Sequence, residues 1–582
     1  MFQLIPYLKG YKKESVIGPL FKLLEACFEL IVPLVMAKII DVGIENRDMP
    51  YILKMGGVLI LLGVIGLACS LTAQYFAAKA AVGFGTELRH DLFRHISTLS
   101  YQEIDQVGSA TLVTRMTSDI NQVQSGVNLV LRLFLRSPFI VVGAVVMAFT
   151  VNFRLAWIFV VAVPLLSIVI YGIMMITIPI YKKVQKGLDQ ILLTTRENLA
   201  GIRVIRAFRT QKAEQQEFEK ESHTLMQDQL RVGWISALMN PLTYLIVNGA
   251  IIVLVWAGAF EVNTGKVSQG EMIALVSYMT QILIALVALA NLIVSFTKAL
   301  ASAGRINEVF AICTTMESPK SRMEKVSDKK CEAVLFDHVQ FRYHGSKEPA
   351  LSDVTFSVSK GETVGIIGGT GSGKSTLVNL IPRFYDASEG RVLFDGADVK
   401  EYPMEKLRGK IGIVPQKATL FRGTIRANIQ WGKQDATDEE IYEALEIAQA
   451  KEFVQEKPKA LDTMISQGGK NLSGGQRQRL TIARALVRKP EVLILDDSAS
   501  ALDFATDAKL RKAIAERTKD MTVFLVSQRA ASILHADKII VMDDGMVTGI
   551  GTHQQLLKTC EVYREICYSQ LSKEEVEQYE KE

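Results

Sequence analysis

The chain has 582 residues, a length that predicts at least two domains. Its mean hydropathy of +0.21 and its 49% hydrophobic content are too high for an ordinary soluble protein. The net charge of +5 comes from 66 basic and 61 acidic residues, a near balance that argues against nucleic acid as a partner. The six cysteines lack paired or metal-ligand spacing, so neither a disulfide framework nor a metal–cysteine site is expected.

Runs of about twenty apolar residues, the length that crosses a bilayer, recur through the first part of the chain. They predict an all-α transmembrane domain over residues 1–310, which begins with a short interfacial helix within residues 1–13. The six expected spans are 16–40, 55–78, 127–151, 155–178, 241–259 and 272–300.

The segments between the spans alternate between short and long. The long ones, 83–124 and 181–233, carry many arginines and lysines, so they are expected to face the cytosol together with both termini. Turn-like breaks at 100–108 and around Gly201 predict short cross-helices that press on a cytosolic domain. A helix broken by glycine, with solvated charges, is the alternative interpretation.

Four ionisable residues fall inside the predicted spans. Glu25 and Glu29 share one face of the first span, and Arg132 and Arg136 share one face of the third. Counted from the outer ends, the carboxylates lie roughly 18–24 Å deep and the guanidinium groups roughly 24–30 Å deep. We expect some of the four to pair across the helices and to line an inward-facing substrate cavity. A purely structural salt bridge is the alternative.

A linker over residues 311–332 is expected to lead into a cytosolic α/β domain over 333–571, followed by a charged tail over 572–582. Strands are predicted at 334–343, 351–359 and 363–367, and a helix at 377–381. Between the last two lies a phosphate-binding loop of the pattern GxxxxGK[ST]. Its candidate ATP-binding residues are Gly368, Gly371, Ser372, Gly373, Lys374, Ser375 and Thr376. Lys374 should reach the β- and γ-phosphates, and Ser375 should bind Mg²⁺.

Three further motifs follow. Asp496 ends the apolar run 492–495, Gln416 follows Val414 and Pro415, and a basic helix at 477–488 follows the sequence LSGGQ. With the phosphate-binding loop, this combination resembles the ATP-binding cassette superfamily. Six spans ahead of one cassette resemble half of an exporter of the multidrug and lipid-exporter type.

The resemblance implies two such halves that sandwich ATP and Mg²⁺ between the phosphate-binding loop of one cassette and the LSGGQ residues of the other. It assigns Tyr343 to adenine stacking, Gln416, Ser375 and Asp496 to the metal, and Asp503 to the D-loop. It assigns the opposite site's ATP contacts to Ser473, Gly474, Gly475 and Gln476, and it implies cross-helices near 101–106 and 201–210, one of which docks on the partner's cassette. Tyr343 as a strand-edge aromatic residue and Gln416 as a turn residue are the alternatives.

Two residues depart from the family pattern at the catalytic positions. Asp497 stands where the family has a glutamate, and Gln528 stands where it has a histidine. The shorter Asp497 side chain would stop roughly 1–1.5 Å short, a misplacement that can cost on the order of a hundredfold in rate. Glutamine cannot change protonation near neutral pH as histidine does. Gln467, ahead of the signature, is a third and looser departure.

These departures predict a subunit of a heterodimeric exporter, and its half-transporter size and the resemblance to bacterial heterodimeric multidrug exporters imply a bacterial plasma membrane. Its own site would bind Mg·ATP and hydrolyse it slowly or not at all, while its intact LSGGQ completes the competent site of a different half-transporter. The expected cargo is hydrophobic or amphipathic, as for multidrug efflux. The alternatives are a lipid flippase, a peptide or cofactor exporter, an ATP-gated regulator or channel, and a homodimer.

Overall fold

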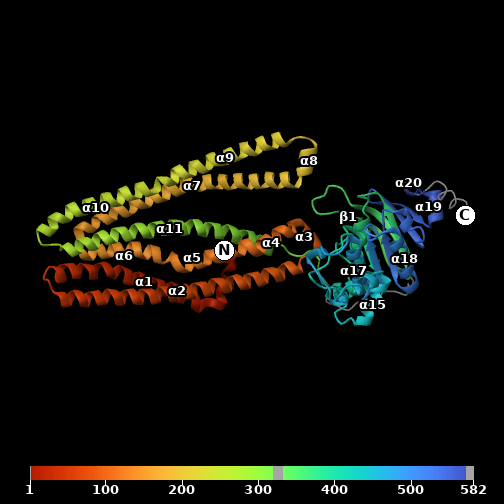
Figure 1. Cartoon of the computed structure of the whole chain (residues 1–582), viewed down its shortest axis with the longest axis horizontal. Coiled ribbons are helices and arrows are strands. Elements are labelled where there is room, and N and C mark those ends of the chain that lie inside the picture. Colours follow the sequence, from red (N-terminus) through yellow and green to blue (C-terminus); the bar gives the residue numbers. More distant parts are fainter. Residues whose placement is uncertain (1, 317, 319–331, 519, 572–582) are drawn as a thin grey trace. The chain divides into compact units, whose positions relative to one another are not determined.

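The computed structural model describes residues 2–316, 318, 332–518 and 520–571. The chain divides into two compact units (Figure 1). The first comprises Met1–Ser97 with Ser109–Ile312, and the second comprises Thr98–Gly108 with Cys313–Glu582. Most of the expected linker, 319–331, and the whole expected tail, 572–582, lie outside the described residues.

The first unit is helical. Five of its helices are long and apolar enough to cross a membrane: Met49–Thr98, Ser109–Val151, Phe153–Ala200, Gln211–Asn263 and Gln269–Phe310. The remaining expected span, 16–40, coincides with α1 (Lys12–Lys38), which carries Lys22, Glu25 and Glu29 and is not among the five. The chain is therefore a multi-pass membrane protein, and the spanning role of α1 stays a prediction.

The elements of this unit follow in chain order. They are η1 (Phe2–Tyr11), α1, η2 (Ile39–Ile44), α2 (Met49–Thr98), α4 (Ser109–Thr114), η3 (Arg115–Asp119), α5 (Ile120–Leu129), η4 (Val130–Phe134), α6 (Arg136–Val151), α7 (Phe153–Ala200), α8 (Ile202–Ala207), α9 (Gln211–Ala237), α10 (Met239–Asn263) and α11 (Gln269–Phe310). Three of them, η2, η3 and η4, are π-helical turns.

The long helices extend well beyond the apolar runs. Helix α2 has 50 residues, which corresponds to about 75 Å against a hydrocarbon core of about 30 Å. The charged segments 83–124 and 181–233 therefore continue the spans largely as helix. Helix α7 lies beside α9 and α10, and the short helix α8 connects the end of α7 to the start of α9 (Figure 1). A short helix, α8, thus lies within the expected segment 201–210, and its role as a cross-helix stays a prediction.

Small residues let the membrane helices approach one another closely. Ala144, Ala148, Ala156 and Ala274 are buried in one core formed by α1, α6, α7, α10 and α11. Tyr278 of α11 is fully buried there, and its hydroxyl donates to the Leu30 carbonyl of α1 at 2.7 Å. That bond satisfies a polar group in a region where water is scarce.

The second unit is an α/β cassette. A six-stranded sheet has the order β12-β11-β3-β10-β9-β6, in which all neighbours are parallel except the β11–β12 pair. An antiparallel four-stranded sheet has the order β2-β1-β4-β5, and β7 pairs with β8. The strands are β1 (Glu332–Phe341), β2 (Leu351–Ser359), β3 (Thr363–Gly368), β4 (Glu389–Phe394), β5 (Ala397–Asp398), β6 (Ile411–Val414), β7 (Gly423–Thr424), β8 (Met464–Ile465), β9 (Val492–Asp496), β10 (Thr522–Val526), β11 (Lys538–Asp543) and β12 (Met546–Gly551).

The helices of this unit include α3, which the chain reaches before the cassette. They are α3 (Tyr101–Val107), α12 (Lys374–Leu380), α13 (Met404–Lys410), α14 (Ile425–Gln430), α15 (Asp438–Ile447), α16 (Lys451–Gln455), η5 (Ala460–Asp462), η6 (Gln467–Gly469), α17 (Gly474–Leu486), α18 (Phe504–Arg517), η7 (Ala530–Ser532), α19 (His553–Thr559) and α20 (Glu561–Gln570).

Three boundaries differ from the sequence-based prediction. Strand β1 ends at Phe341, opposite Leu351, so Tyr343 lies beyond the strand. Helix α12 already begins at Lys374, directly after the left-handed Gly373. Helix α17 begins at Gly474 because the Ser473 hydroxyl caps it.

Candidate functional site

The phosphate-binding loop connects β3, a central strand of the six-stranded sheet, to α12. Gly371 and Gly373 have φ values of +87° and +91°, which other residues adopt only at a cost. A Cβ atom on Gly368 would lie 2.1 Å from the Met542 carbonyl oxygen. The loop therefore needs its glycines, as the motif predicts.

Lys374 lies against this loop and is 8% exposed. Its ammonium group donates to the carbonyl oxygens of Gly368 and Gly369, at 2.9 and 2.5 Å. Burial lowers the pKa of Lys374, while the carboxylates of Asp497 and Asp496 act to raise it. The lysine is thus a cation held next to two carboxylates, at the start of a helix.

Ser375 and Asp496 come together as the sequence predicted. The Ser375 hydroxyl donates to Asp496 Oδ1 at 2.9 Å, and Asp496 ends strand β9. Burial raises the pKa of Asp496, and the Asp497 carboxylate raises it further, whereas the Ser375 hydrogen bond and Lys374 oppose the shift. A hydroxyl and a carboxylate oxygen at this separation fit the hard-oxygen coordination of Mg²⁺, which also takes ligands from a bound phosphate.

Asp497 occupies a turn directly after β9 and has a φ of +45°. Its amide donates to the Val526 carbonyl at 2.9 Å, and its own carbonyl accepts from the Ser500 hydroxyl at 2.8 Å. Its carboxylate accepts a hydrogen bond of 3.0 Å from the Gln416 side-chain amide. The structure thus brings together Gln416 and Asp497, which are 81 residues apart in the chain.

Gln528 lies after β10 and is exposed. Its carbonyl accepts from the Gln570 side chain at 2.8 Å, which fixes its backbone. Among the residues that the structure describes, no hydrogen bond joins its side chain to Asp497 or to Lys374.

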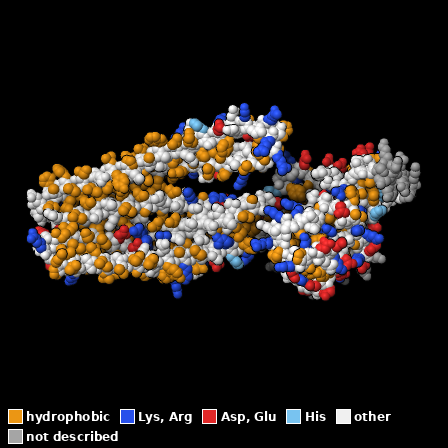
Figure 2. All heavy atoms as spheres, viewed as in Figure 1, with side chains coloured by type: hydrophobic (Ala, Val, Ile, Leu, Met, Phe, Trp, Pro, Cys, Tyr) orange, Lys and Arg blue, Asp and Glu red, His pale blue; other side chains and the backbone are white. Residues whose placement is uncertain are grey.

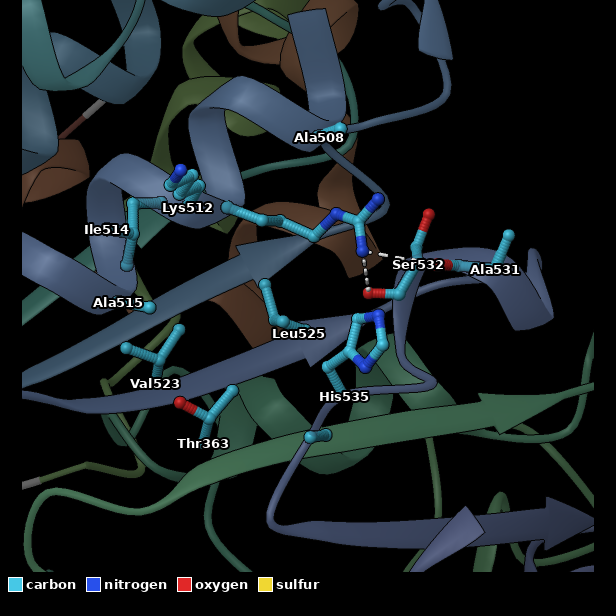
Figure 3. A pocket seen from close by; sticks show the side chains of 12 residues that line it. Thr363, Ala508, Lys512, Ile514, Ala515, Val523, Leu525, Ala531, Ser532 and His535 are labelled. Atoms are coloured by element: carbon cyan, nitrogen blue, oxygen red, sulfur yellow. Dashed lines mark hydrogen bonds between the residues drawn. The ribbon is translucent and has the colours of Figure 1, made fainter. Parts of the chain in front are cut away.

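A hollow of about 330 Å³ lies near this segment, between α18 and β10 (Figure 3). Arg511 of α18 donates across it to the carbonyls of Ala531 and Ser532, at 3.1 and 3.3 Å. No residue of the phosphate-binding loop or of the LSGGQ motif is among the residues that line it. The hollow is thus separate from the ATP motifs, and Arg511 ties α18 to the turn that follows Gln528.

The signature residues lie on the cassette surface. Ser473 and Gly474 are exposed, while Gly475 and Gln476 are half-buried. The Ser473 hydroxyl accepts from the Gln476 amide at 3.2 Å, and the Gln476 side chain accepts from the Ser473 amide at 3.1 Å. This capping box fixes the N-terminus of the 13-residue helix α17, whose first amide groups favour an anion.

Asp503 caps the next helix of the site. It accepts from the Thr506 amide at 2.9 Å and from the Thr506 hydroxyl at 2.8 Å, at the start of α18. These two hydrogen bonds lower the pKa of Asp503. Asp503 is therefore an ionised, exposed helix cap in this structure.

Tyr343 belongs to an aromatic group beside the phosphate-binding loop. Its hydroxyl lies 3.0 Å from the Thr376 hydroxyl, and its ring meets Phe341 and Tyr385 edge-on, with centroid distances of 4.8 and 5.4 Å. Tyr343 is 37% exposed, as a residue that stacks on a nucleotide base has to be. Tyr385 was not foreseen from the sequence, where it follows the phosphate-binding helix without any motif.

Tyr385 connects this aromatic group to α3. Its hydroxyl donates to Asp105 at 2.6 Å, and the Tyr101 ring lies 4.5 Å from the Phe384 ring. A groove of about 590 Å³ is lined by Tyr101, Phe384 and Asp496 among others. The expected cross-helix near 101–106 is thus confirmed as α3, and it packs on the cassette of its own chain.

The charged residues of the membrane unit pair in part as expected. Arg136 donates to Glu29 at 2.7 Å, which links α6 to α1. Glu25 instead pairs with Lys22, one turn earlier on α1, at 2.5 Å. Lys22, which the sequence analysis passed over, also donates to the Ser70 hydroxyl of α2 at 3.2 Å. Arg132 makes no ion pair or hydrogen bond with any residue that the structure describes.

Comparison with known proteins agrees with both units. Residues 15–287 match the family "ABC transporter transmembrane region", and residues 351–500 match the family "ABC transporter". The chain is 37% identical to the "uncharacterized ABC transporter ATP-binding protein YfiB" of Bacillus subtilis, over 99% of both chains. This chain is an ABC transporter. As a member of this ATPase family, it has the cassette that couples ATP hydrolysis to transport.

Other relatives of the transporter have more specific names. It is 33% identical to a putative multidrug export ATP-binding/permease protein of Bacillus subtilis, over 96% of this chain and 97% of the relative. It is 30% identical to an ATP-dependent lipid A-core flippase of Salmonella paratyphi A, over 97% and 96%. A solved structure of a bacterial Atm1-family ABC exporter with ATP bound has the same fold, with a TM-score of 0.78, 23% identity and coverage of 97% and 99%.

Proposed function

We propose that this transporter is one half of a heterodimeric exporter and that its own Walker residues form a slow ATP site. The observation that carries the proposal is the Gln416–Asp497 hydrogen bond of 3.0 Å. It supports a role for the Asp497 carboxylate as the counterpart of the family's catalytic base, on a side chain one methylene shorter than glutamate. A base displaced by about 1 Å loses on the order of a hundredfold in rate.

ATP binding does not depend on the two altered residues, and this chain has all the residues expected to bind the phosphates and Mg²⁺. The phosphate-binding loop, Lys374 and the Ser375–Asp496 pair have the geometry described above. The site would therefore hold Mg·ATP and release it slowly. In a heterodimer of this kind, the ATP retained at the slow site keeps the two cassettes together while the second site hydrolyses its own ATP.

The second site would use the LSGGQ residues of this chain. Ser473 and Gly474 are exposed, and the helix N-terminus behind them is fixed by its capping box. A partner cassette with glutamate and histidine at the catalytic positions would supply the remaining groups. Helix α8 would dock on that partner's cassette through Val204, which is 60% exposed, and through Phe208, which directly follows the helix and is 76% exposed.

The proposed cargo is a hydrophobic or amphipathic compound, exported across a bacterial plasma membrane from a cytoplasmic cassette side. The named multidrug relative favours this class, and the flippase relative favours a lipid as the second candidate. Export of a peptide or cofactor, and an ATP-gated regulator or channel, remain less supported because none of the relatives cited above is named for them.

The test starts from this chain expressed both alone and with the protein that co-purifies from its native membrane. Alone, it should be nearly inactive as an ATPase. The double variant Asp497→Glu with Gln528→His should raise the turnover of the chain alone by about 10–100-fold, because it restores the reach of the base and a titratable switch residue. Asp435→Glu, at an exposed position of the loop before α15, is the control and should leave the turnover unchanged.

Two outcomes would contradict the proposal. Brisk ATPase activity from the pure wild-type homodimer would make the chain a symmetric pump. Trapping of hydrolysed nucleotide at this chain's Walker site as fast as at the partner's would do the same. The two cargo classes are then distinguished in vesicles, by comparing ATP-dependent uptake of labelled lipophilic dyes with ATP-dependent transfer of labelled lipids.

A further inference from the structure

A cluster of charged residues lies inside the membrane unit, and we name it the α1–α6 charged cluster. It consists of Lys22, Glu25 and Glu29 on α1 with Arg132 and Arg136 on η4 and α6. Figure 2 shows acidic and basic side chains within the otherwise hydrophobic part of the helical unit. Charges in such surroundings cost several kcal/mol unless they are paired or wet, and they commonly mark substrate paths.

The charges within the cluster do not cancel. Lys22, Arg132 and Arg136 are three cations, while Glu25 and Glu29 are two carboxylates. The pairs Lys22–Glu25 and Arg136–Glu29 account for both carboxylates. The Arg132 guanidinium is left without an ion pair or hydrogen bond within the part of the chain that the structure describes. The cluster therefore carries one uncompensated positive charge.

Other polar groups beside it also lack partners. Ser137 is 1% exposed, and neither its hydroxyl nor the buried Nε of Arg136 has a hydrogen-bond partner among the described residues. Gln281 of α11 donates to the Glu29 carbonyl at 3.4 Å, but its buried side-chain oxygen has no partner in the same part of the chain. Buried polar groups without partners are rare in proteins and call for an explanation.

The backbone at Arg132 is unusual as well. Arg132 lies in η4, a π-helical turn over Val130–Phe134 that contacts both α1 and α11. Such turns occur often at functional sites, because the wider turn redirects the side chains it carries. The Glu29 side chain beside it is 39% exposed, so the cluster borders an accessible surface and is not sealed in the core.

We propose that the α1–α6 charged cluster binds the anionic group of an amphipathic substrate, with Arg132 as the main contact and Arg136 as the second. The inference rests on the proposed export function and narrows its cargo from hydrophobic compounds in general to those carrying a phosphate or carboxylate. A guanidinium group suits these anions because its planar fork donates two parallel hydrogen bonds. The apolar part of the substrate would lie against the surrounding helices.

The test measures equilibrium binding without nucleotide, on the complex purified through this chain in nanodiscs of phosphatidylcholine. The probe is radiolabelled dodecyl phosphate, with dodecanol and dodecyltrimethylammonium as the uncharged and cationic controls. Dodecyl phosphate should bind at least about tenfold more tightly than either control, as expected for a charge-assisted hydrogen bond. Nanodiscs containing phosphatidylglycerol show the source of the anion: competition indicates a lipid headgroup, and its absence indicates a soluble amphipathic anion.

Two variants should shift the affinity in opposite directions. Arg132→Gln should weaken binding of dodecyl phosphate about tenfold or more, because it removes the unpaired cation. Glu29→Gln should strengthen binding severalfold, because it releases Arg136 from its ion pair. If the charge network were merely structural, Glu29→Gln would not increase the affinity for dodecyl phosphate. Arg154→Gln, whose arginine pairs with Glu261 and is 76% exposed, is the control and should leave binding unchanged.

Equal binding of dodecyl phosphate and dodecanol would overturn the inference, as would loss of binding in both Arg132→Gln and Glu29→Gln. If Arg132→Gln does not assemble, Arg132→Lys keeps the charge, loses the fork and should weaken binding by a smaller factor. The measurement needs neither hydrolysis nor a known partner. Fast ATPase activity of a homodimer would therefore refute the slow-site proposal and leave this inference standing.

Discussion

The cassette has two surfaces that an ABC transporter applies to ATP, and they are built differently. On the Walker surface the functional side chains bond to one another: Lys374 to its loop, Ser375 to Asp496, and Gln416 to Asp497. On the signature surface, the Ser473 and Gln476 side chains form a capping box, and Ser473 and Gly474 are open to solvent. In the proposed dimer, each surface would face the complementary surface of a second cassette.

The departures at the catalytic positions lie on one of these surfaces. Asp497 and Gln528 belong to the Walker side, whereas the sequence LSGGQ is unchanged and only the looser departure, Gln467, lies ahead of it. Substitutions on the two surfaces should therefore have unequal effects on the assembled complex. The prediction with the largest expected effect tests that inequality. Two predictions with smaller effects test how the Walker surface is connected to α3 and how α3 itself is stabilised.

The largest effect is expected for Gly474→Glu on the signature surface. A Cβ atom at Gly474 meets nothing within 4 Å, so the cassette should fold normally, and an acidic residue is favourable in the first turn of a helix. Opposite a nucleotide, however, the new carboxylate would repel the γ-phosphate. ATPase activity of the native complex should fall at least about a hundredfold, since an electrostatic contact to the transition state is replaced by a repulsion.

Asp497→Asn on the Walker surface is the matched variant for that experiment. If the Walker site is already slow, this change should lower the activity of the complex by less than about twofold, because little hydrolysis depends on this carboxylate. Similar losses from Gly474→Glu and Asp497→Asn would remove the distinction between the two surfaces.

A smaller effect is expected for Tyr385→Phe, which tests whether the Walker surface is connected to α3. The variant loses the 2.6 Å hydrogen bond to Asp105 and keeps the ring contacts with Tyr343 and Tyr101. Stimulation of ATPase activity by substrate should fall about threefold to tenfold, the size expected for one hydrogen bond to a charged group.

Tyr402→Phe provides the control for this hydroxyl. Tyr402 is 9% exposed, and its hydroxyl has no hydrogen-bond partner among the residues described. Its basal and stimulated activities should both match the wild type. An unchanged stimulation in Tyr385→Phe would show that α3 senses the nucleotide by another route.

The smallest effect is a local one at Glu103 of α3. Burial acts to raise the pKa of Glu103, but hydrogen bonds from Ser100 and Thr315 outweigh it and hold the pKa below its usual range. A lowered pKa means that the ionised group stabilises the fold above its unfolded pKa of about 4.3 and that this stability is lost as the pH falls through the folded pKa. Glu103→Gln should therefore weaken α3 by about 1–2 kcal/mol at pH 7.

Hydrogen exchange over residues 100–107 measures this loss. The difference between Glu103→Gln and the wild type should stay constant from pH 8 to pH 5 and shrink only below about pH 4, where the carboxyl group becomes neutral. A difference that is the same at every pH would mean that the charge of Glu103 plays no part.

Much of the cassette could be predicted from its sequence because its motifs lie on regular elements. The β3–loop–α12 unit and β9 were found within a few residues, since each motif requires a fixed strand–turn geometry. Tyr343 was misplaced in a strand because pairing with β2 ends at Phe341, a long-range feature that local sequence does not contain. Tyr385 and Asp105 carry no motif, and only the tertiary fold joins them.

The membrane unit was predicted less completely. Hydropathy located the apolar runs, but helix ends such as that of α2 at Thr98 lie well beyond them. The pairing of Arg136 with Glu29 followed from their similar depths. The Lys22–Glu25 pair was missed because a lysine near the start of an apolar run resembles an ordinary helix flank. The slow site itself remains a prediction, since geometry without nucleotide does not measure a rate.

The left-handed backbone at Asp497 has a consequence for engineering the site. A φ of +45° is adopted more readily by aspartate and asparagine than by glutamate. A glutamate introduced here gains reach and loses part of that local conformational preference, so activation by Asp497→Glu exchanges some rigidity of the turn for turnover.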